Sequence, residues 1–153
     1  LDVLDAAATE SALTATRPEV VVCQATALSA VDANMRRFDR YFAVTNRLRT
    51  EGTANLLAAV RKIGGARVIA QSFGASGYPP EGPPAQDESA GFNPKPPAAM
   101  AGIFAAIRRL EELVTATPDH VVLRYGGFYG PGTALDRHSP QVEALRASRY
   151  PLQ

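Results

Sequence analysis

The sequence predicts an α/β fold with a doubly wound parallel sheet, and three observations support this prediction. Short apolar runs suited to buried strands alternate with longer stretches of helical periodicity. The connections between these runs are long enough for crossover helices, which join parallel strands in the right-handed sense. Each run ends in polar or glycine residues, and in such sheets ligands bind at the carboxyl ends of the strands.

The chain begins with a predicted helix and a predicted strand. Residues 4–16 have helical spacing, and Pro18 and Glu19 interrupt that pattern. The run VVVC follows at residues 20–23 and is rich in β-branched side chains. Such a run suits a strand that is buried on both faces.

A long helical stretch is expected next, over residues 31–63, with a break or bend near Gly52. The pair Gly64-Gly65 predicts the end of this stretch, because glycine readily adopts the left-handed conformation that closes a helix. The run RVIA at residues 67–70 is the second predicted strand. Strand, helix and strand therefore follow in the order of a parallel crossover unit.

A long surface loop is predicted over residues 78–97, because this segment carries seven prolines. Helical periodicity returns over residues 98–115. The helix is expected to have an apolar face and a largely charged outer face. The apolar face would contain Ile103, Ile107, Leu110 and Val114, and the outer face Arg108, Arg109, Glu111 and Glu112.

The third predicted strand covers residues 120–124 and leads into a glycine-rich loop at residues 126–132. Parallel strands end at one edge of a sheet, so three segments are expected to meet there. They are residues 24–26, residues 71–73 and the loop that follows Arg124.

Composition excludes several classes of protein. The 153 residues are 46% hydrophobic and 20% charged, which fits one globular domain with a core that needs no disulfide or structural metal. Sixteen basic and fifteen acidic residues leave a net charge of +1, without the basic run that a nucleic-acid partner would require. We therefore expect no nucleic-acid partner.

Cysteine content and hydropathy bear on the compartment. Cys23 is the one cysteine, so no internal disulfide can form, and its most economical interpretation is a small buried side chain. Cysteine and histidine are too few and too scattered for a metal site. No apolar stretch is long enough to span a membrane, and the first residues lack the basic region of a signal peptide. We expect a cytoplasmic protein without a membrane or metal partner.

Four segments in order resemble the extended short-chain dehydrogenase/reductase family, the NAD(P)-dependent epimerases and dehydratases. They are VVVCQA at residues 20–25, EGTANLL at 51–57, RVIAQS at 67–72 and LRYGGFYGPG at 123–132. The resemblance runs over roughly residues 1–135 and implies a Rossmann-type sheet. It also implies a glycine-rich GxxGxxG turn that this sequence does not contain. The chain is therefore interpreted as a central part of such a protein.

The resemblance implies a dinucleotide cofactor, either NAD or NADP, and assigns residues to it. Asp2 and Val3 would lie near the adenine, and Ala25 and Thr26 would pass under the ribose and phosphates. The backbone of the segment after the third strand would approach the nicotinamide, and this segment comprises Tyr125, Gly126, Gly127 and Phe128.

The catalytic pattern of the family is altered in this sequence. Members carry a tyrosine and, four residues later, a lysine, which together exchange a proton with the substrate during hydride transfer. No Tyr-x-x-x-Lys occurs here. Aligning Glu112 with the family's glutamate places Phe104 at the tyrosine position and Arg108 at the lysine position. Phe104 cannot carry a proton, while Arg108 could hold a positive charge near a ribose.

Ser72 matches the family's catalytic serine, which would donate a hydrogen bond to a substrate oxygen. Ser76 is the substitute if the loop is shifted, and a turn-capping role for the hydroxyl is the other interpretation. The missing phenol could come from Tyr78, Tyr125 or Tyr129 instead.

Two functions follow from the resemblance. The first is an epimerase/dehydratase-like oxidoreductase that transfers hydride to or from a nucleotide sugar or a similar carbonyl or alcohol. The second is a dinucleotide-binding module without turnover, a sensor or scaffold. Residues 1–135 would form a partial NAD(P)-binding domain, and residues 136–153 the start of a substrate-binding region. A homodimer is a further expectation.

Overall fold

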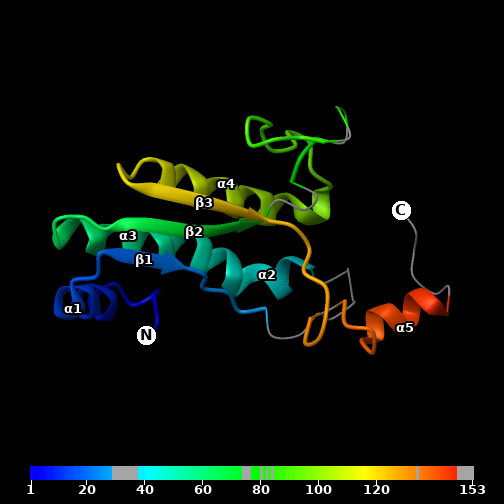
Figure 1. Cartoon of the computed structure of the whole chain (residues 1–153), viewed down its shortest axis with the longest axis horizontal. Helices are drawn as coiled ribbons and strands as arrows, with labels where there is room; N and C mark the ends of the chain where they lie inside the picture. Colours follow the sequence, from blue (N-terminus) through cyan, green and yellow to red (C-terminus); the bar gives the residue numbers. More distant parts are fainter. Residues whose placement is uncertain are drawn as a thin grey trace.

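The computed structural model describes residues 1–28, 38–73, 77–79, 81, 83, 85–133 and 135–147. In this part of the chain helices and strands alternate (Figure 1). The elements are α1 (Ala6–Thr16), β1 (Val20–Cys23), α2 (Phe38–Arg47), the π-helical turn η2 (Leu48–Gly52), α3 (Thr53–Lys62), β2 (Arg67–Phe73), the 3-10 turn η3 (Ala98–Met100), α4 (Ala101–Thr115), β3 (His120–Tyr125) and α5 (Pro140–Arg146).

The three strands form one parallel sheet in the order β1-β2-β3. Val21 of β1 lies opposite Val68 of β2, and Ala70 of β2 lies opposite Val122 of β3. Because all three strands run the same way, their carboxyl ends share one edge of the sheet. The predicted parallel α/β fold is confirmed.

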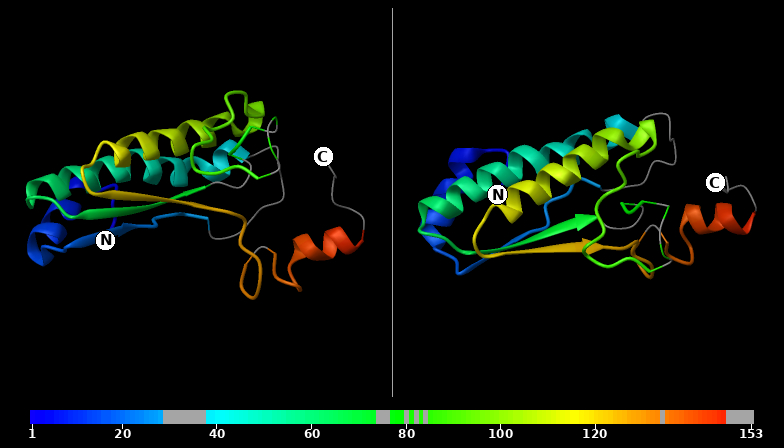
Figure 2. Two further views of the ribbon diagram at one scale, coloured as in Figure 1. Left: turned by 45° about the horizontal axis from the view of Figure 1, so that its top comes forward. Right: turned by 90° about the horizontal axis from the view of Figure 1, so that it is seen from above.

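Helices α1, α3 and α4 form a layer on one face of this sheet (Figures 1 and 2). The core lies between this layer and the sheet. Val60 of α3 and Val114 of α4 meet Val68 and Ala70 of β2, and all four are at most 2% exposed. Alternate residues of a strand point to opposite faces, so Val68 and Ala70 mark the covered face.

The opposite face of the sheet is bare in the part of the chain that the structure describes. Val20 and Val22 are 47% and 56% exposed, and Val121 of β3 is 38% exposed. These positions alternate with the buried ones, which places them on the uncovered face. The second helical layer that a doubly wound sheet carries is not among the described residues.

Local sequence signals account for the helix ends. The Asp5 side chain accepts a hydrogen bond of 3.0 Å from the amide of Ala8 and caps α1. At the end of α3, Gly64 and Gly65 have φ angles of 93° and 105°, and the Gly65 amide donates to the carbonyl of Val60. Glycine adopts these angles without strain, so the predicted helix stop is confirmed.

The expected break near Gly52 is a π-helical turn rather than an interruption. Helix α2 continues through η2 into α3, and Gly52 is buried. A β-carbon at position 52 would come within 2.8 Å of Cγ2 of Val3. Gly52 thus allows the N-terminal segment to lie against the turn. The first part of the predicted stretch, residues 31–37, lies outside the described residues.

Strand β2 is three residues longer than expected, because Gln71, Ser72 and Phe73 continue the pairing with β3. The loop expected at 78–97 contains no helix or strand among its described residues. Helix α5 lies apart from the sheet (Figure 1). Within the described ranges, none of the helices has the length and apolarity that a membrane crossing requires.

Candidate functional site

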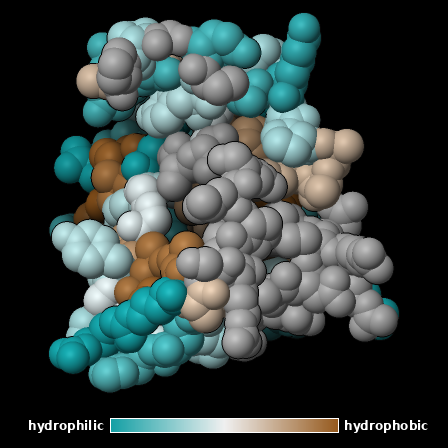
Figure 3. Space-filling model, turned by 90° about the vertical axis from the view of Figure 1, so that its right-hand side faces the viewer, coloured by the Kyte–Doolittle hydropathy of each residue, from teal (hydrophilic) through white to brown (hydrophobic). Residues whose placement is uncertain are grey.

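A cavity of about 270 Å³ opens at the carboxyl ends of the three strands. Figure 3 views the molecule from this side and shows hydrophobic patches between hydrophilic residues at the top and the bottom. The sheet edge, η2, α3 and α4 all contribute to the lining. The lining residues are Cys23, Gln24, Ala25, Thr26, Leu28, Leu48, Arg49, Thr53, Gln71, Ser72, Phe73, Leu110, Tyr125, Gly126, Gly127 and Phe128.

The cavity brings together most of the residues that the sequence singled out. Parallel pairing in the predicted order carries the ends of β1, β2 and β3 to it, although they are far apart in the sequence. The predicted site residues that line the cavity are Ala25, Thr26, Ser72, Tyr125, Gly126, Gly127 and Phe128.

The segment after β3 leaves room for a ligand at this edge. A β-carbon built on Gly126 or Gly127 would meet no atom of the chain within 4 Å. Just beyond, the rings of Tyr125 and Phe128 lie 5.4 Å apart at an angle of 58°. Phe128 is 58% exposed, so an apolar surface remains available there. Small residues beside exposed aromatic rings suit close approach by a planar ring.

Ser72 is buried, and its hydroxyl is engaged within the protein. It donates a hydrogen bond of 2.6 Å to Oε1 of Glu111 on α4. Glu111 also accepts from Arg124 of β3, with Nε to Oε1 at 3.0 Å and Nη2 to Oε2 at 2.8 Å. The two charged side chains are only 19% and 13% exposed. The hydrogen bonds from Glu111 hold the pKa of Arg124 well above its ordinary value.

Arg124 also holds the proline-rich loop against the sheet end. Its Nη1 donates to the carbonyl of Ala90 at 3.0 Å, and its guanidinium lies 4.6 Å from the ring centre of Phe92. From α4, Nη2 of Arg108 donates to the carbonyl of Asn93 at 2.6 Å. Two arginines from different elements therefore fix residues 90–93.

The outer face expected for α4 is wrong at two of its four positions. Arg109 and Glu112 are exposed, as predicted. Glu111 and Arg108 are half-buried, because Glu111 faces the sheet end and Arg108 faces the loop. Arg108 does not line the cavity. Its proposed role near a ribose remains a prediction.

The residues considered for proton transfer lie in different environments. Phe104, on α4, is 3% exposed and belongs to the hydrophobic core of the protein. Tyr125 lines the cavity, whereas Tyr129 is 85% exposed and does not, and the ring of Tyr78 lies 5.7 Å from the Arg124 guanidinium. Ser76 lies outside the described residues. Of the three candidate phenols, Tyr125 is the one at the cavity.

Asp2 and Val3 lie beside the cavity wall rather than in it. Val3 packs on Gly52, and Nδ2 of Asn55 donates to the carbonyl of Val3 at 3.0 Å. Asp2 accepts from the amide of Leu4 at 2.9 Å. The proposed contact of Asp2 and Val3 with an adenine stays a prediction.

Cys23 lines the cavity at the end of β1 as a half-buried thiol. Burial raises the pKa of this thiol, and hydrogen bonds with Ala25 and Thr53 partly oppose the rise. The thiol is therefore protonated at neutral pH and is a weak nucleophile. Within the described residues, no group of three His, Cys, Asp or Glu side chains could hold a metal ion.

The sequence assigned no role at this site to Glu111 or Arg49. Glu111 falls four residues after Ile107, so helical spacing alone places it at the border of the apolar face. Arg49 lines the cavity from η2, and nothing in its sequence neighbourhood marks it. Only the three-dimensional structure places these two residues at the site.

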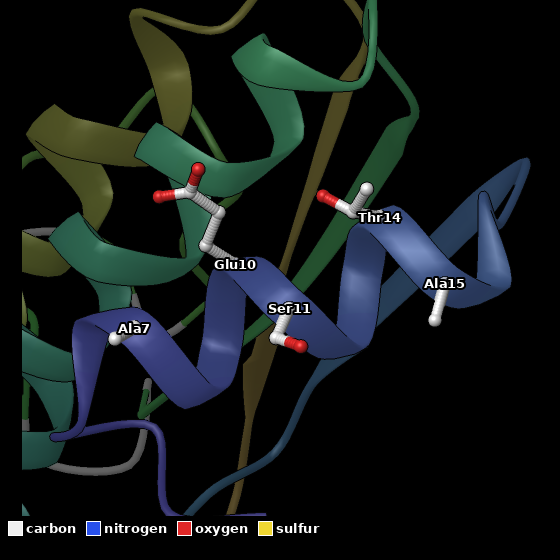
Figure 4. Close-up of a pocket in the computed structure, with 5 residues that line it drawn as sticks. All are labelled: Ala7, Glu10, Ser11, Thr14 and Ala15. Carbon is white, nitrogen blue, oxygen red and sulfur yellow. The ribbon is translucent and has the colours of Figure 1, made fainter.

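A second depression lies over the outer surface of α1 (Figure 4). Unlike the cavity, it is not lined by residues from several elements. It is lined by small side chains of one helix and by Glu10, whose carboxylate pairs with Lys62 of α3. A surface of this kind offers little to hold a ligand.

Residues 1–148 match the NAD dependent epimerase/dehydratase family. The chain belongs to this family. The match covers nearly the whole sequence, and the cavity lies where parallel sheets of this kind bind ligands. The suspected resemblance is confirmed.

One curated relative is a 3-diazoavenalumate denitrifying reductase from a Streptomyces species. It is 43% identical over 155 residues, a match that covers 99% of this chain and 49% of the relative. The chain thus spans about half the length of this relative.

Solved structures share the fold. A UDP-glucose 4-epimerase from Thermus thermophilus, in complex with NAD, is 30% identical with a TM-score of 0.61, covering 97% of this chain and 46% of that one. A dTDP-4-dehydrorhamnose reductase from Clostridium acetobutylicum is 21% identical with a TM-score of 0.67, covering 97% and 48%. The expected nicotinamide cofactor is confirmed at the level of the family, which is NAD-dependent.

Proposed function

We propose that this chain acts as part of an NAD(P)-dependent oxidoreductase and that its cavity receives the nicotinamide end of the cofactor beside the substrate. One observation carries the proposal: the ends of three adjacent parallel strands deliver Ala25, Ser72 and Tyr125 to one cavity. A cavity of about 270 Å³ is at the small end of ligand sites, so it fits one ring and its substituents rather than a whole dinucleotide.

The residues present fit such a group. Gly126 and Gly127 leave space where side chains would project, and Tyr125 and Phe128 offer aromatic surface. Ala25 and Thr26 would support the ribose side. The cofactor would supply or accept a hydride, and this chain's residues would orient the ring and exclude water.

Ser72 is proposed to act by position rather than by touching the substrate, because its hydroxyl already donates to Glu111. Tyr125 is the proposed source of a proton, since its ring is at the cavity and the family's tyrosine position holds Phe104. A reductase is favoured over an epimerase, because a relative at 43% identity is named as one. Substrates would be carbonyl or related acceptor compounds, with nucleotide sugars as one class.

A dinucleotide-binding module without turnover is the second candidate. Phe104 is sealed in the core and Arg108 is bound to the loop carbonyl of Asn93, so α4 presents no titrating pair to the cavity. A cytoplasmic location is proposed from the cysteine content, and a homodimer from the family resemblance alone.

Binding and turnover measured on the same sample separate the two candidates. NADH and NADPH are titrated by the change in nicotinamide fluorescence, and cofactor oxidation is then followed with carbonyl and nucleotide-sugar substrates. The oxidoreductase predicts binding followed by a fall in nicotinamide absorbance. The module predicts binding with constant absorbance. Absence of binding by either cofactor would contradict both.

A further inference from the structure

Arg49 is the one charged residue among the described residues that line the cavity. It lies on the turn η2, and Cys23 and Thr53 line the same cavity. The remaining lining side chains are apolar or neutral. Any ligand in the cavity therefore meets a single positive charge and no described carboxylate.

The guanidinium of Arg49 is poorly satisfied within the described residues. Its hydrogen bond there joins Nη1 to Oδ1 of Asn46 at 3.4 Å, close to the limit for such a bond. A guanidinium has five N–H donors, so most of them have no partner in the described part of the chain. The other half-buried arginines differ, since Arg108 holds a carbonyl at 2.6 Å and Arg124 a carboxylate.

Burial makes this arrangement costly. Desolvation lowers the pKa of Arg49, although an arginine stays charged in a protein. A half-buried charge without an opposite charge loses hydration and gains little in return. A ligand that brings a negative group to Arg49 would offset that loss, and the planar fork of a guanidinium matches a carboxylate or phosphoryl group.

We propose that Arg49 forms an oxyanion subsite, which binds a carboxylate or phosphoryl group of the ligand that occupies the cavity. This inference rests on the proposed function, because it assumes that the cavity is the ligand site. It adds the chemical class of the group recognised there. The oxyanion belongs either to an acidic substrate or to the cofactor's phosphates.

Arg47 provides a matched control on the same helical stretch. It is exposed and pairs with Glu51 through a bond of 2.8 Å, and it does not line the cavity. Arg47→Gln and Arg49→Gln remove the same charge two residues apart. A general loss of positive potential would affect both variants equally, whereas a subsite affects one.

The test is equilibrium binding of benzoate, inorganic phosphate and NADPH to the 153-residue chain and its variants. We expect Arg49→Gln to weaken binding of an oxyanion about ten- to a hundredfold, the usual value of a charge-assisted hydrogen bond. Arg49→Lys should lose less affinity for the oxyanion, because lysine keeps the positive charge but lacks the planar guanidinium group. Arg47→Gln should bind as the unaltered chain does. Circular dichroism verifies that each variant is folded.

The probes identify the source of the oxyanion. Selective weakening of benzoate assigns the subsite to an acidic substrate, and joint weakening of phosphate and NADPH assigns it to the cofactor. Equal affinities in Arg49→Gln and the unaltered chain, or an equal loss in Arg47→Gln, would overturn the inference. If the chain binds NADPH and Arg49→Gln changes none of the affinities, the subsite is refuted and the proposed function stands. Oxyanion binding without NADPH binding would instead count against the proposed function.

Discussion

The hydroxyl of Ser72 donates a 2.6 Å hydrogen bond to Oε1 of Glu111, and the same oxygen accepts from Nε of Arg124 at 3.0 Å. Strand β2, helix α4 and strand β3 are thereby joined at the sheet edge where the cavity opens. The ion pair is mostly shielded from water, so its integrity should matter more than that of an exposed pair.

Glu111→Gln should lower the free energy of unfolding by about 2–4 kcal/mol, because Arg124 would keep its charge in a half-buried place without a carboxylate. Ser72→Ala should cost only about 1 kcal/mol, since the ion pair survives. Chemical denaturation of both variants measures these values. Glu112→Gln is the control, since its exposed pair with Arg109 should change stability by less than about 1 kcal/mol. An equal effect of Glu111→Gln and Glu112→Gln would refute the structural role of the pair.

Arg108→Gln should release the loop over residues 90–93, because the loop loses the 2.6 Å bond to the carbonyl of Asn93. The peptide bond after Glu88 is already exposed, and a released loop would adapt more readily to the active site of a glutamyl endopeptidase. We expect cleavage there to become several-fold faster under native conditions. Arg109→Gln, on the exposed side of α4, should leave the rate unchanged. Equal rates for the two variants would show that Arg108 does not hold the loop.

Much of this architecture was predictable from local patterns. The β-branched run at residues 20–23 forms β1 over those four residues, as predicted. The expected burial on both faces is wrong for the described part of the chain, where Val21 is buried but Val20 and Val22 are exposed. The glycines at 64 and 65 end α3 because only their conformational freedom allows the observed φ angles. Parallel order followed from the length of the connections, and it was enough to bring Ala25, Ser72 and Tyr125 together.

The pairing of side chains was not predictable in the same way. The role of Ser72 as a donor to a substrate oxygen stays a prediction, but its hydrogen bond to Glu111, which lies 39 residues later, could not be predicted from the sequence. Glu111 was predicted on the outer face, because the helical periodicity of residues 98–115 separates the charged residues from the apolar ones. Such contacts depend on which helix crosses which strand end. Local periodicity carries no information on that geometry.

Cys23 should react slowly with iodoacetamide, at least about tenfold more slowly than in the unfolded chain, because burial raises its pKa and shields the sulfur. A folded pKa above the unfolded value means that the buried neutral thiol stabilises the fold below the unfolded pKa. That contribution is lost as the pH rises through the folded pKa. Mass spectrometry of the alkylated chain measures the rate.

The same thiol reports on the cavity. Because Cys23 lines it, a cofactor that fills the cavity should slow the alkylation further. The urea-unfolded chain serves as the control, in which NADPH should have no effect. Alkylation in the folded chain that NADPH leaves unchanged, at a concentration that saturates binding, would place the cofactor elsewhere.

Val22→Lys should reduce self-association of the 153-residue chain. Val22 is 56% exposed on the bare face of the sheet, and β1 pairs only with β2 among the described residues, so its other edge is free to pair with another chain. A lysine there opposes both apolar contact and strand pairing.

Light scattering should show association of the unaltered chain and less association of the Val22→Lys variant. Val44→Lys, at an apolar position of α2 that is 50% exposed, should associate as before, because α2 offers no strand edge. If the unaltered chain is a monodisperse monomer with one cooperative thermal transition, the bare face and free edge do not drive association.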